Sequence, residues 1–236
     1  MSEQHEAELV RCLAAVKERI RVACERAGRD TAEVTLVGVS KTKPLADLQV
    51  AVAAGLNDLG ENYVQEAVDK ISHWQGPAPL WHFIGPIQSN KTRQIAEHFD
   101  WVHSVDRLKI ARRLSEQRPE EMAPLKVLVQ VNISDDPAKA GVPVAAVAEL
   151  VGAMAELPGL EVRGIMAIPA LDLSEDELRR QFLQLKSLSD TLTSDHPGCS
   201  AISMGMSADF EMAIACGATH VRVGSAIFGA RPAPPN

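Results

Sequence analysis

The sequence predicts a single (β/α)8 barrel, also called a TIM barrel, and three observations support this fold class. Short apolar runs alternate along the chain with amphipathic helical patterns, and eight such runs occur. The 236 residues are enough for a barrel of this kind, which needs roughly 200 to 250. Polar residues follow most of the runs, and a barrel gathers such residues on one rim. The alternation therefore favours a barrel over a doubly wound sheet.

The chain begins with an expected helix that packs on the barrel and carries no site. Its apolar residues recur at steps of three and four, namely Leu9, Leu13, Val16, Ile20 and Ala23. Gly28 then ends the helix. We divide the chain into an N-terminal helix (1–30), the barrel (31–230) and a proline-rich tail (231–236).

The expected strands are short and rich in β-branched or aromatic residues. In chain order they cover residues 34–40, 58–60, 80–84, 101–104, 127–132, 160–168, 201–203 and 221–223. Helical patterns fill the intervals at 45–54, 64–71, 91–98, 108–118, 144–156, 176–192 and 208–216, with a short last helix at 226–228. No stretch has the composition of a linker, so one domain is the economical interpretation.

The composition argues against several classes of protein. A net charge of -7 with no basic stripe argues against binding to nucleic acid or to anionic membranes. The four cysteines are far apart in the sequence, so neither a zinc site nor a disulfide framework is indicated. No apolar run reaches about 18 residues, and the N-terminus lacks the pattern of a signal peptide. We expect a cytoplasmic protein in a reducing compartment, without a metal.

Lys41 directly follows the first expected strand, and lysine is an unusual residue for the end of a strand. Lys43 and Pro44 come next, so a solvated turn is one interpretation. Two segments late in the chain, 203–207 (SMGMS) and 221–225 (VRVGS), favour instead a role for Lys41 in a binding site. Both close a strand with hydroxyl and glycine residues, which suit a phosphate group. A lysine amine near a phosphate cradle indicates pyridoxal 5'-phosphate, whose aldehyde forms an imine with lysine.

The proposed phosphate cradle lies in the loops after the last two strands, where barrels often bind phosphate. Ser207 stands where the N-cap of helix 208–216 is expected, and Gly224 and Ser225 directly precede the short helix 226–228. The alternative is that both serines only cap helices and that the glycine only allows a turn.

Imine formation needs a neutral amine, so the pKa of Lys41 must be lowered by burial or by nearby cations. Lys43 is expected to be solvated. Arg222 can donate a hydrogen bond to the pyridine nitrogen, but it cannot keep a proton on that nitrogen as a carboxylate would. The ring is then a weaker electron sink for carbanion chemistry. The alternative for Arg222 is a structural ion pair.

Two further residues have open interpretations. Asn62 either contacts the 3-hydroxyl of the cofactor or caps helix 64–71. His82 alternates with the apolar residues Trp81 and Phe83, so it is either an interior histidine with its hydrogen bonds satisfied or an acid or base.

The motifs as a set resemble those of the pyridoxal phosphate homeostasis protein family, also known as YggS or PROSC. They are 39–42 (VSKT), 60–66 (GENYVQE), 82–85 (HFIG) with Gln88, Asn90 and Lys91, 164–166 (GIM), 203–207 with Asp209, and 221–229 (VRVGSAIFG). The resemblance implies a barrel related to the N-terminal domain of alanine racemase, with pyridoxal phosphate as an internal aldimine on Lys41. It also implies phosphate contacts from Ser207, Gly224 and Ser225, with Arg222 near the pyridine nitrogen.

The resemblance further implies a protein that binds and regulates the vitamin B6 pool without an established catalytic activity. Apo forms of pyridoxal-phosphate-dependent enzymes are then the expected partners. Alanine racemases supply a second acid/base from an additional β domain, which this sequence lacks, so we expect a monomeric carrier. The alternatives are a low-activity racemase, with Lys41 and either Tyr63 or His82 as its bases, and a phosphate-binding barrel for another ligand.

Overall fold

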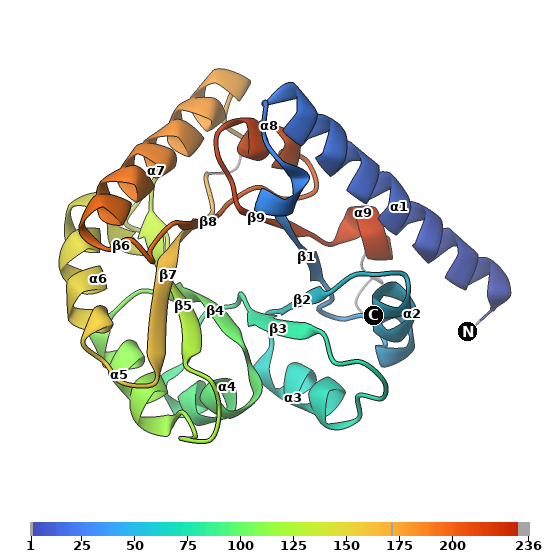
Figure 1. Cartoon of the computed structure of the whole chain (residues 1–236), viewed down its shortest axis with the longest axis horizontal. Coiled ribbons are helices and arrows are strands. Elements are labelled where there is room, and N and C mark those ends of the chain that lie inside the picture. Colours follow the sequence, from blue (N-terminus) through green and yellow to red (C-terminus); the bar gives the residue numbers. More distant parts are fainter. Residues whose placement is uncertain (1, 171, 231–236) are drawn as a thin grey trace.

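The computed structural model describes residues 2–170 and 172–230, and these residues form a closed parallel barrel surrounded by helices (Figure 1). The strands are β1 (Thr35–Val39), β2 (Asp58–Glu61), β3 (Leu80–Phe83), β4 (Trp101–Val105), β5 (Leu125–Asn132), β7 (Leu160–Ala167), β8 (Ala201–Ser203) and β9 (His220–Val223). They pair in the order β4-β3-β2-β1-β9-β8-β7-β5, and pairing of β4 with β5 closes the ring. The predicted (β/α)8 barrel is therefore confirmed. The expected tail 231–236 lies outside the described residues.

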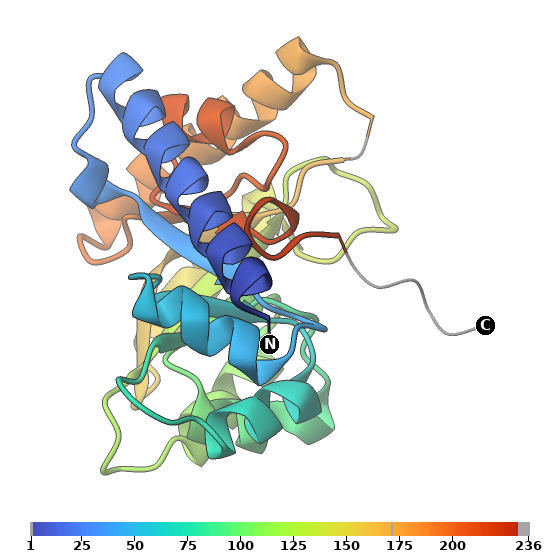
Figure 2. The ribbon, with the colours of Figure 1, turned by 90° about the vertical axis from the view of Figure 1, so that its right-hand side faces the viewer.

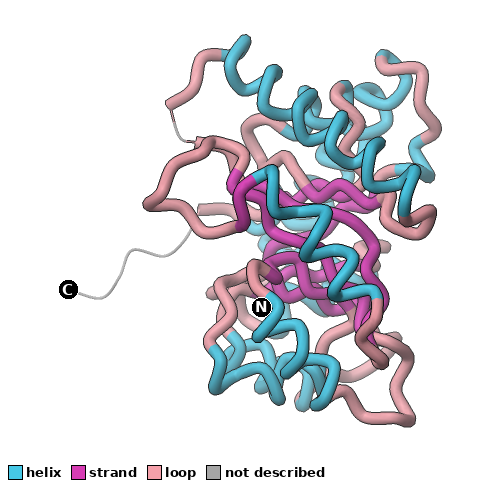
Figure 3. Tube along the Cα trace, turned by 90° about the vertical axis from the view of Figure 1, so that its left-hand side faces the viewer, coloured by secondary structure: helices cyan, strands magenta, loops and turns pink. Residues whose placement is uncertain are grey.

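The helices cover the outside of the barrel, with the strands in the middle (Figure 3). They are α1 (Glu3–Arg26), α2 (Leu45–Ala53), α3 (Val64–Ser72), α4 (Thr92–His98), α5 (Leu108–Gln117), α6 (Val147–Ala155), α7 (Glu175–Asp195), α8 (Phe210–Ala215) and α9 (Ser225–Phe228). The expected N-terminal helix is α1, which packs against α2, α8 and α9 (Figure 2). No helix within the described parts of the chain is long and apolar enough to cross a membrane.

The structure departs from the expected elements at a few boundaries. A two-residue strand, β6 (Val142–Pro143), pairs with the end of β5 and was not predicted, because two residues carry no periodic pattern. The expected helices 91–98 and 144–156 are preceded or opened by 3-10 turns, η2 (Ser89–Lys91) and η3 (Val144–Ala146). Such turns are common at the N-termini of α-helices, and they share the apolar spacing of the helix that follows. A third turn, η1 (Thr31–Glu33), leads into β1.

The apolar core and the barrel interior differ in composition. Large buried side chains such as Phe83, Phe99 and Phe210 belong to an extended core of strands and helices. A separate cluster contains only Trp101, Leu128, Met166 and Ala201. Barrel interiors are usually filled with layers of bulky branched side chains. Here the buried rings of His82, His103 and His220 lie beside Trp101, which makes this interior unusually polar.

Candidate functional site

A cavity of about 370 Å³ opens beyond the carboxyl ends of the strands, within the size range of small-molecule sites. All six residues predicted to bind the ligand line it: Lys41, Asn62, Ser207, Arg222, Gly224 and Ser225. Apolar walls come from Val39, Ile84 and Met206. The fold thus brings Lys41 and Asn62, from the first part of the sequence, to one site with four residues between 207 and 225.

Lys41 is delivered to the cavity by the alternation of strand β1. Successive side chains of a strand point to opposite faces, so Val39 and Lys41 line the cavity while Ser40 between them is buried on the other side. Thr42 follows with a φ of 63°, a left-handed conformation that residues other than glycine adopt infrequently. The backbone therefore turns sharply directly after Lys41.

Helix α3 holds the backbone on both sides of Lys41. Lys70 Nζ donates to the carbonyl oxygen of Ser40 at 2.9 Å. Glu66 Oε1 accepts from the backbone N–H of Thr42 at 2.6 Å, which fixes the left-handed turn. One residue before Lys41 and one residue after it are thus bound to the same helix.

These two contacts belong to a buried charged cluster, which we term the Lys70 network: Lys70, Glu61, Glu66 and Ser40. Lys70 Nζ lies 2.7 Å from Glu61 Oε1 and 2.6 Å from Glu66 Oε1. Ser40 Oγ donates to Glu61 Oε1 at 2.6 Å. Glu61 is completely buried, and burial raises its pKa, although Lys70 opposes that shift. The sequence analysis did not identify this network.

Lys43 is not simply solvated, so that expectation was wrong. Its Nζ donates to the carbonyl oxygens of Phe228 at 2.7 Å and of Ala230 at 2.9 Å. Lys43 also lines the cavity, and it ties the end of α9 to the loop that carries Lys41. Its charge is therefore used to hold two parts of the rim together.

In the loop after β8, Ser207 lines the cavity but does not cap a helix. Helix α8 begins at Phe210, and its N-cap is Asp209, which makes no side-chain capping bond. The Asp209 carboxylate accepts instead from the N–H of Met206 at 2.6 Å. Ser207 Oγ accepts instead from the N–H of Gly224 at 3.3 Å. The expected N-cap at Ser207 is thus wrong, and its hydroxyl links the two loops of the expected phosphate cradle.

Ser225 is likewise not an N-cap. It is the first residue of α9, and Gly224 occupies the N-cap position without a side-chain hydrogen bond. The first N–H groups of a helix have no acceptor within that helix. Gly224 and Ser225 both line the cavity, so the start of α9 and the Ser225 hydroxyl border it.

Arg222 forms the floor of the cavity and is only 4% exposed. Its Nη1 donates to Ser203 Oγ at 2.6 Å and its Nη2 to the carbonyl oxygen of Ala167 at 3.1 Å. Among the described residues its partners are thus neutral, and the alternative of a structural ion pair is not observed. Burial lowers the pKa of Arg222 to about 10, so the guanidinium remains cationic at neutral pH.

Asn62 has a buried side-chain oxygen without a hydrogen-bond partner among the residues that the structure describes. It does not cap α3, whose N-cap is Tyr63 with no side-chain hydrogen bond, so that alternative was wrong. Gly85 lets the next loop approach, because an added Cβ there would lie 2.2 Å from the backbone oxygen of Asn62. A buried polar atom normally has a partner, so Asn62 is suited to a ligand group that donates a hydrogen bond.

His82 is an interior histidine with both ring nitrogens in hydrogen bonds. Nε2 lies 2.9 Å from Asp58 Oδ1, and Nδ1 lies 2.9 Å from Nε2 of His103. His82 does not line the cavity, and neither does Tyr63, which is 52% exposed beside a different hollow. The two residues considered as a second base are thus not among the described residues that line the cavity.

The donor set of the cavity fits the cofactor that the sequence indicates. An amine, hydroxyls and backbone amides on one side, and a buried cation on the floor, match an aldehyde, a phosphate monoester and a pyridine nitrogen. The unpartnered oxygen of Asn62 matches a hydroxyl donor. The described residues contain no group of three or more histidine, cysteine or acidic side chains that could hold a metal ion.

Comparison with known proteins gives consistent results. The family model described as "Alanine racemase, N-terminal domain" matches residues 12–232. The pyridoxal phosphate homeostasis protein of Escherichia coli (strain K12) is 52% identical over 225 residues, which cover 93% of this chain and 95% of that protein. The structure of PipY from Synechococcus elongatus with pyridoxal phosphate bound has a TM-score of 0.78 and 37% identity, covering 91% of this chain and 100% of that one.

A more distant structure shares the fold. Alanine racemase from Corynebacterium glutamicum is 18% identical with a TM-score of 0.69. The match covers 92% of this chain but 62% of the racemase chain.

Proposed function

The chain belongs to the pyridoxal phosphate homeostasis protein family, and from that premise we propose that it binds pyridoxal 5'-phosphate at the mouth of its barrel and holds it for release to other proteins, without using it in catalysis. The observation that carries this proposal is the placement of six residues of matching chemistry on one cavity. The likeness to PipY, whose structure contains the cofactor, supports it.

In this proposal Lys41 bonds covalently to the cofactor and the loops bind its phosphate. The neutral amine of Lys41 condenses with the aldehyde, and one water molecule leaves. Ser207 and Ser225 donate hydrogen bonds from their hydroxyls to the phosphate oxygens, and Gly224, which has no side chain, lets the phosphate approach closely. When bound, the cofactor supplies an aldehyde that reacts reversibly with amines, and that reactivity is what a carrier must mask.

Asn62 and Arg222 contact the ring in this arrangement. Asn62 accepts a hydrogen bond from the 3-hydroxyl through its unpartnered oxygen. Arg222 donates to the pyridine nitrogen, and because its pKa of about 10 keeps it protonated, it leaves that nitrogen without a proton. An unprotonated ring is a weak electron sink, which suits storage better than carbanion chemistry.

Among the described residues, the two candidates for a second base in racemisation do not line the cavity. Such a reaction needs a second acid/base on the face opposite to the lysine. Neither Tyr63 nor His82 is among the described residues that line the cavity. This supports a carrier over the racemase alternative.

We further propose that the recipients are apo forms of pyridoxal-phosphate-dependent enzymes, and that a monomeric carrier serves them in the cytoplasm. Ile168 and Met206 line the cavity and are 42% and 38% exposed, so the ligand lies beside an apolar rim that a partner can contact. The cysteines of the described chain are free thiols, which agrees with a reducing compartment.

A transfer experiment separates a carrier from an enzyme. Protein loaded with pyridoxal phosphate is mixed with an apo aminotransferase, and recovery of aminotransferase activity is followed. In parallel, alanine is incubated with the loaded protein in D2O, and exchange of the α-proton is followed by NMR. We expect transfer without exchange, and no transfer from Lys41→Ala.

Lys186→Ala is the matched control, because Lys186 lies on α7 and pairs with Asp190 far from the cavity. Proton exchange by the wild-type protein that is absent in Lys41→Ala would instead identify a racemase or a related enzyme.

A further inference from the structure

A continuous chain of four hydrogen bonds crosses the barrel interior and ends on Arg222. It runs from Asp58 to His82 at 2.9 Å, from His82 to His103 at 2.9 Å, from His103 Nδ1 to Ser203 Oγ at 2.9 Å, and from Ser203 to Arg222 at 2.6 Å. We term the first four residues the histidine relay. His82, His103 and Ser203 are completely buried, and the Asp58 side chain is 16% exposed.

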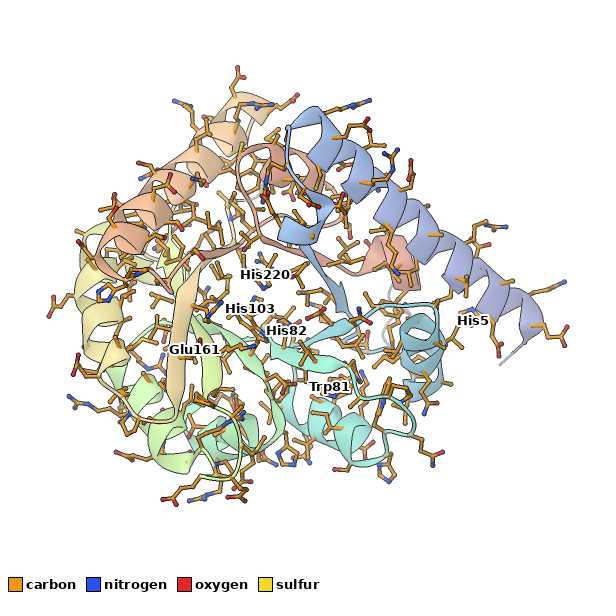
Figure 4. The ribbon with its side chains drawn as sticks, viewed as in Figure 1. His5, Trp81, His82, His103, Glu161 and His220 are labelled. Atoms are coloured by element: carbon orange, nitrogen blue, oxygen red, sulfur yellow. The ribbon has the colours of Figure 1, made fainter. Side chains whose placement is uncertain are left out.

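The relay joins opposite sides of the barrel. Its members come from β2, β3 and β4 and then from β8, so the contact between His103 and Ser203 spans strands that are not neighbours in the sheet. Figure 4 shows His82 and His103 pointing into the interior from the strands on one side, with His220 close by. His220 is not a member, since its ring bonds to Thr219.

The chemistry at the two ends fixes the direction of every hydrogen. Arg222 can only donate, so Ser203 Oγ accepts from it, and the Asp58 carboxylate can only accept, so His82 donates from Nε2. With one N–H on each ring, Nδ1 of His82 accepts from Nε2 of His103. Nδ1 of His103 then accepts from the hydroxyl of Ser203. In this order every member has its hydrogen bonds satisfied.

The opposite order is unfavourable in this environment. It requires either an additional cation on a ring or an Asp58 carboxylate without its donor. In the opposite order Nδ1–H of His103 would point at the Ser203 oxygen that already accepts from Arg222, and the Ser203 hydroxyl hydrogen would have no acceptor in the relay. Burial, and next to it His82, His220 and Arg222, hold the pKa of His103 well below its usual value, so the additional cation is not on His103. An unpaired polar group in this dry interior would also lose a hydrogen bond that water cannot replace.

We propose that the histidine relay is a positioning device for Arg222: its hydrogens all point from Arg222 towards Asp58, and this order holds the guanidinium in one orientation at the floor of the cavity. Ser203 and the carbonyl of Ala167 each take one N–H, which leaves the rest of the guanidinium plane to the cavity. A donor fixed before the ligand arrives loses less conformational entropy on binding. The order of the hydrogens is independent of the proposed function, whereas the effect on ligand binding rests on it.

The order of the hydrogens is tested without any ligand. Protein labelled with 15N in its histidines is studied by long-range 1H–15N NMR at neutral pH. We expect His82 and His103 each to carry their proton on Nε2, and Asp58→Asn to give a mixture of tautomers at His82. A proton on Nδ1 of His103, or a cationic His103, in the wild-type protein would overturn the proposal.

The positioning role is tested with two variants of one residue. An asparagine amide places its polar atoms near Nδ1 of a histidine, and a glutamine amide near Nε2. His103→Asn should therefore keep the contact with Ser203, while His103→Gln should keep only the contact with His82. We expect the dissociation constant for pyridoxal phosphate to rise roughly 5- to 10-fold in His103→Gln, the equivalent of one hydrogen bond, and less than 2-fold in His103→Asn.

His220→Asn is the matched control, because it shrinks a ring in the same interior and keeps the contact with Thr219. Equal losses of affinity in all three variants would show a packing effect and overturn the positioning role. The 15N signals of the Arg222 guanidinium give a second readout in the apo protein. If the guanidinium of Arg222 rotates slowly in the wild type and in His103→Asn but faster in His103→Gln, the proposal is supported. The same rate of rotation in all three proteins contradicts it.

If the wild-type protein fails to bind pyridoxal phosphate, the proposed function fails. The histidine tautomers and the rotation of the Arg222 guanidinium, both measured without ligand, still test the histidine relay.

Discussion

Two buried polar networks end beside the cavity, and they are built in opposite ways. The Lys70 network lies between the barrel and helix α3, and it consists of full charges held 2.6 to 2.7 Å apart. The histidine relay lies inside the barrel and joins the carboxylate of Asp58 to the guanidinium of Arg222 through two imidazoles and a hydroxyl. The first holds the backbone around Lys41, and the second contacts the side chain of Arg222.

The difference indicates a different role for each network. Removing one member of a buried ion pair leaves an uncompensated charge, whereas breaking a neutral hydrogen bond leaves only an unpaired polar group. We therefore expect damage to the Lys70 network to affect folding stability first. Damage to the histidine relay should affect the properties of the site more than the stability of the fold.

The largest effect is expected from Lys70→Met. It leaves Glu61 buried without its cation and frees the carbonyl of Ser40, directly before Lys41. The free energy of unfolding, measured by urea denaturation, should fall by about 3 to 5 kcal/mol. Glu66→Gln is the control within the same network, because the Glu66 side chain is 29% exposed and its loss should cost less. Equal effects of the two variants would contradict the contrast drawn between the networks.

The next effect concerns pH and the histidines of the interior. Burial lowers the pKa of His220 to about 3 and also lowers that of His103. Nearby groups also oppose protonation of each ring. For His220 they are His82, Arg222, Arg163 and Lys126. For His103 they are His82, His220 and Arg222. Below the usual histidine pKa of 6.5 the unfolded chain therefore binds more protons than the folded one.

Stability should thus be complete above pH 6.5 and should be lost as the pH falls from there towards the folded-state pKa. Each histidine contributes a slope of about 1.4 kcal/mol per pH unit. We expect unfolding free energies measured between pH 7 and pH 4.5 to fall less steeply for His220→Asn than for the wild type. Parallel curves for the two proteins would show that His220 does not remain neutral in the folded state.

The smallest effect is expected on the phosphate side, which belongs to neither network. Ser225→Ala removes one hydroxyl donor and leaves the backbone amides in place. The affinity for pyridoxal phosphate should fall by about 0.5 to 1.5 kcal/mol, while the affinity for pyridoxal, which has no phosphate, should not change. Titration calorimetry with both ligands measures this difference. Equal losses for the two ligands would place Ser225 away from the phosphate.

The elements and the rim could be predicted because both follow from local patterns. The alternating apolar periods predicted the strands and helices. Because a barrel places the carboxyl ends of all its strands on one rim, Lys41 and Arg222 could be assigned to one site without knowledge of their contacts. The expected N-cap at Ser207 was wrong because α8 begins two residues later than expected, at Phe210, with Asp209 at its N-cap.

The two networks could not be predicted in the same way, since they join residues through the fold. His103 and Ser203 are separated by 100 positions, and Lys70 meets Glu61 only after α3 packs against β2. One signal was present: in residues 101–105 (WVHSV) a histidine occupies an inward position of a strand, where an apolar residue is usual.

The central claim is that this cavity binds pyridoxal phosphate through Lys41. The most direct test is to incubate the wild-type protein with pyridoxal phosphate, record its visible absorption spectrum before and after borohydride, and locate the reduced adduct by peptide mass mapping. We predict an absorption band that borohydride bleaches, with the added mass on Lys41 and none on Lys43. A protein that stays colourless and unmodified, or one modified at another lysine, would contradict the claim.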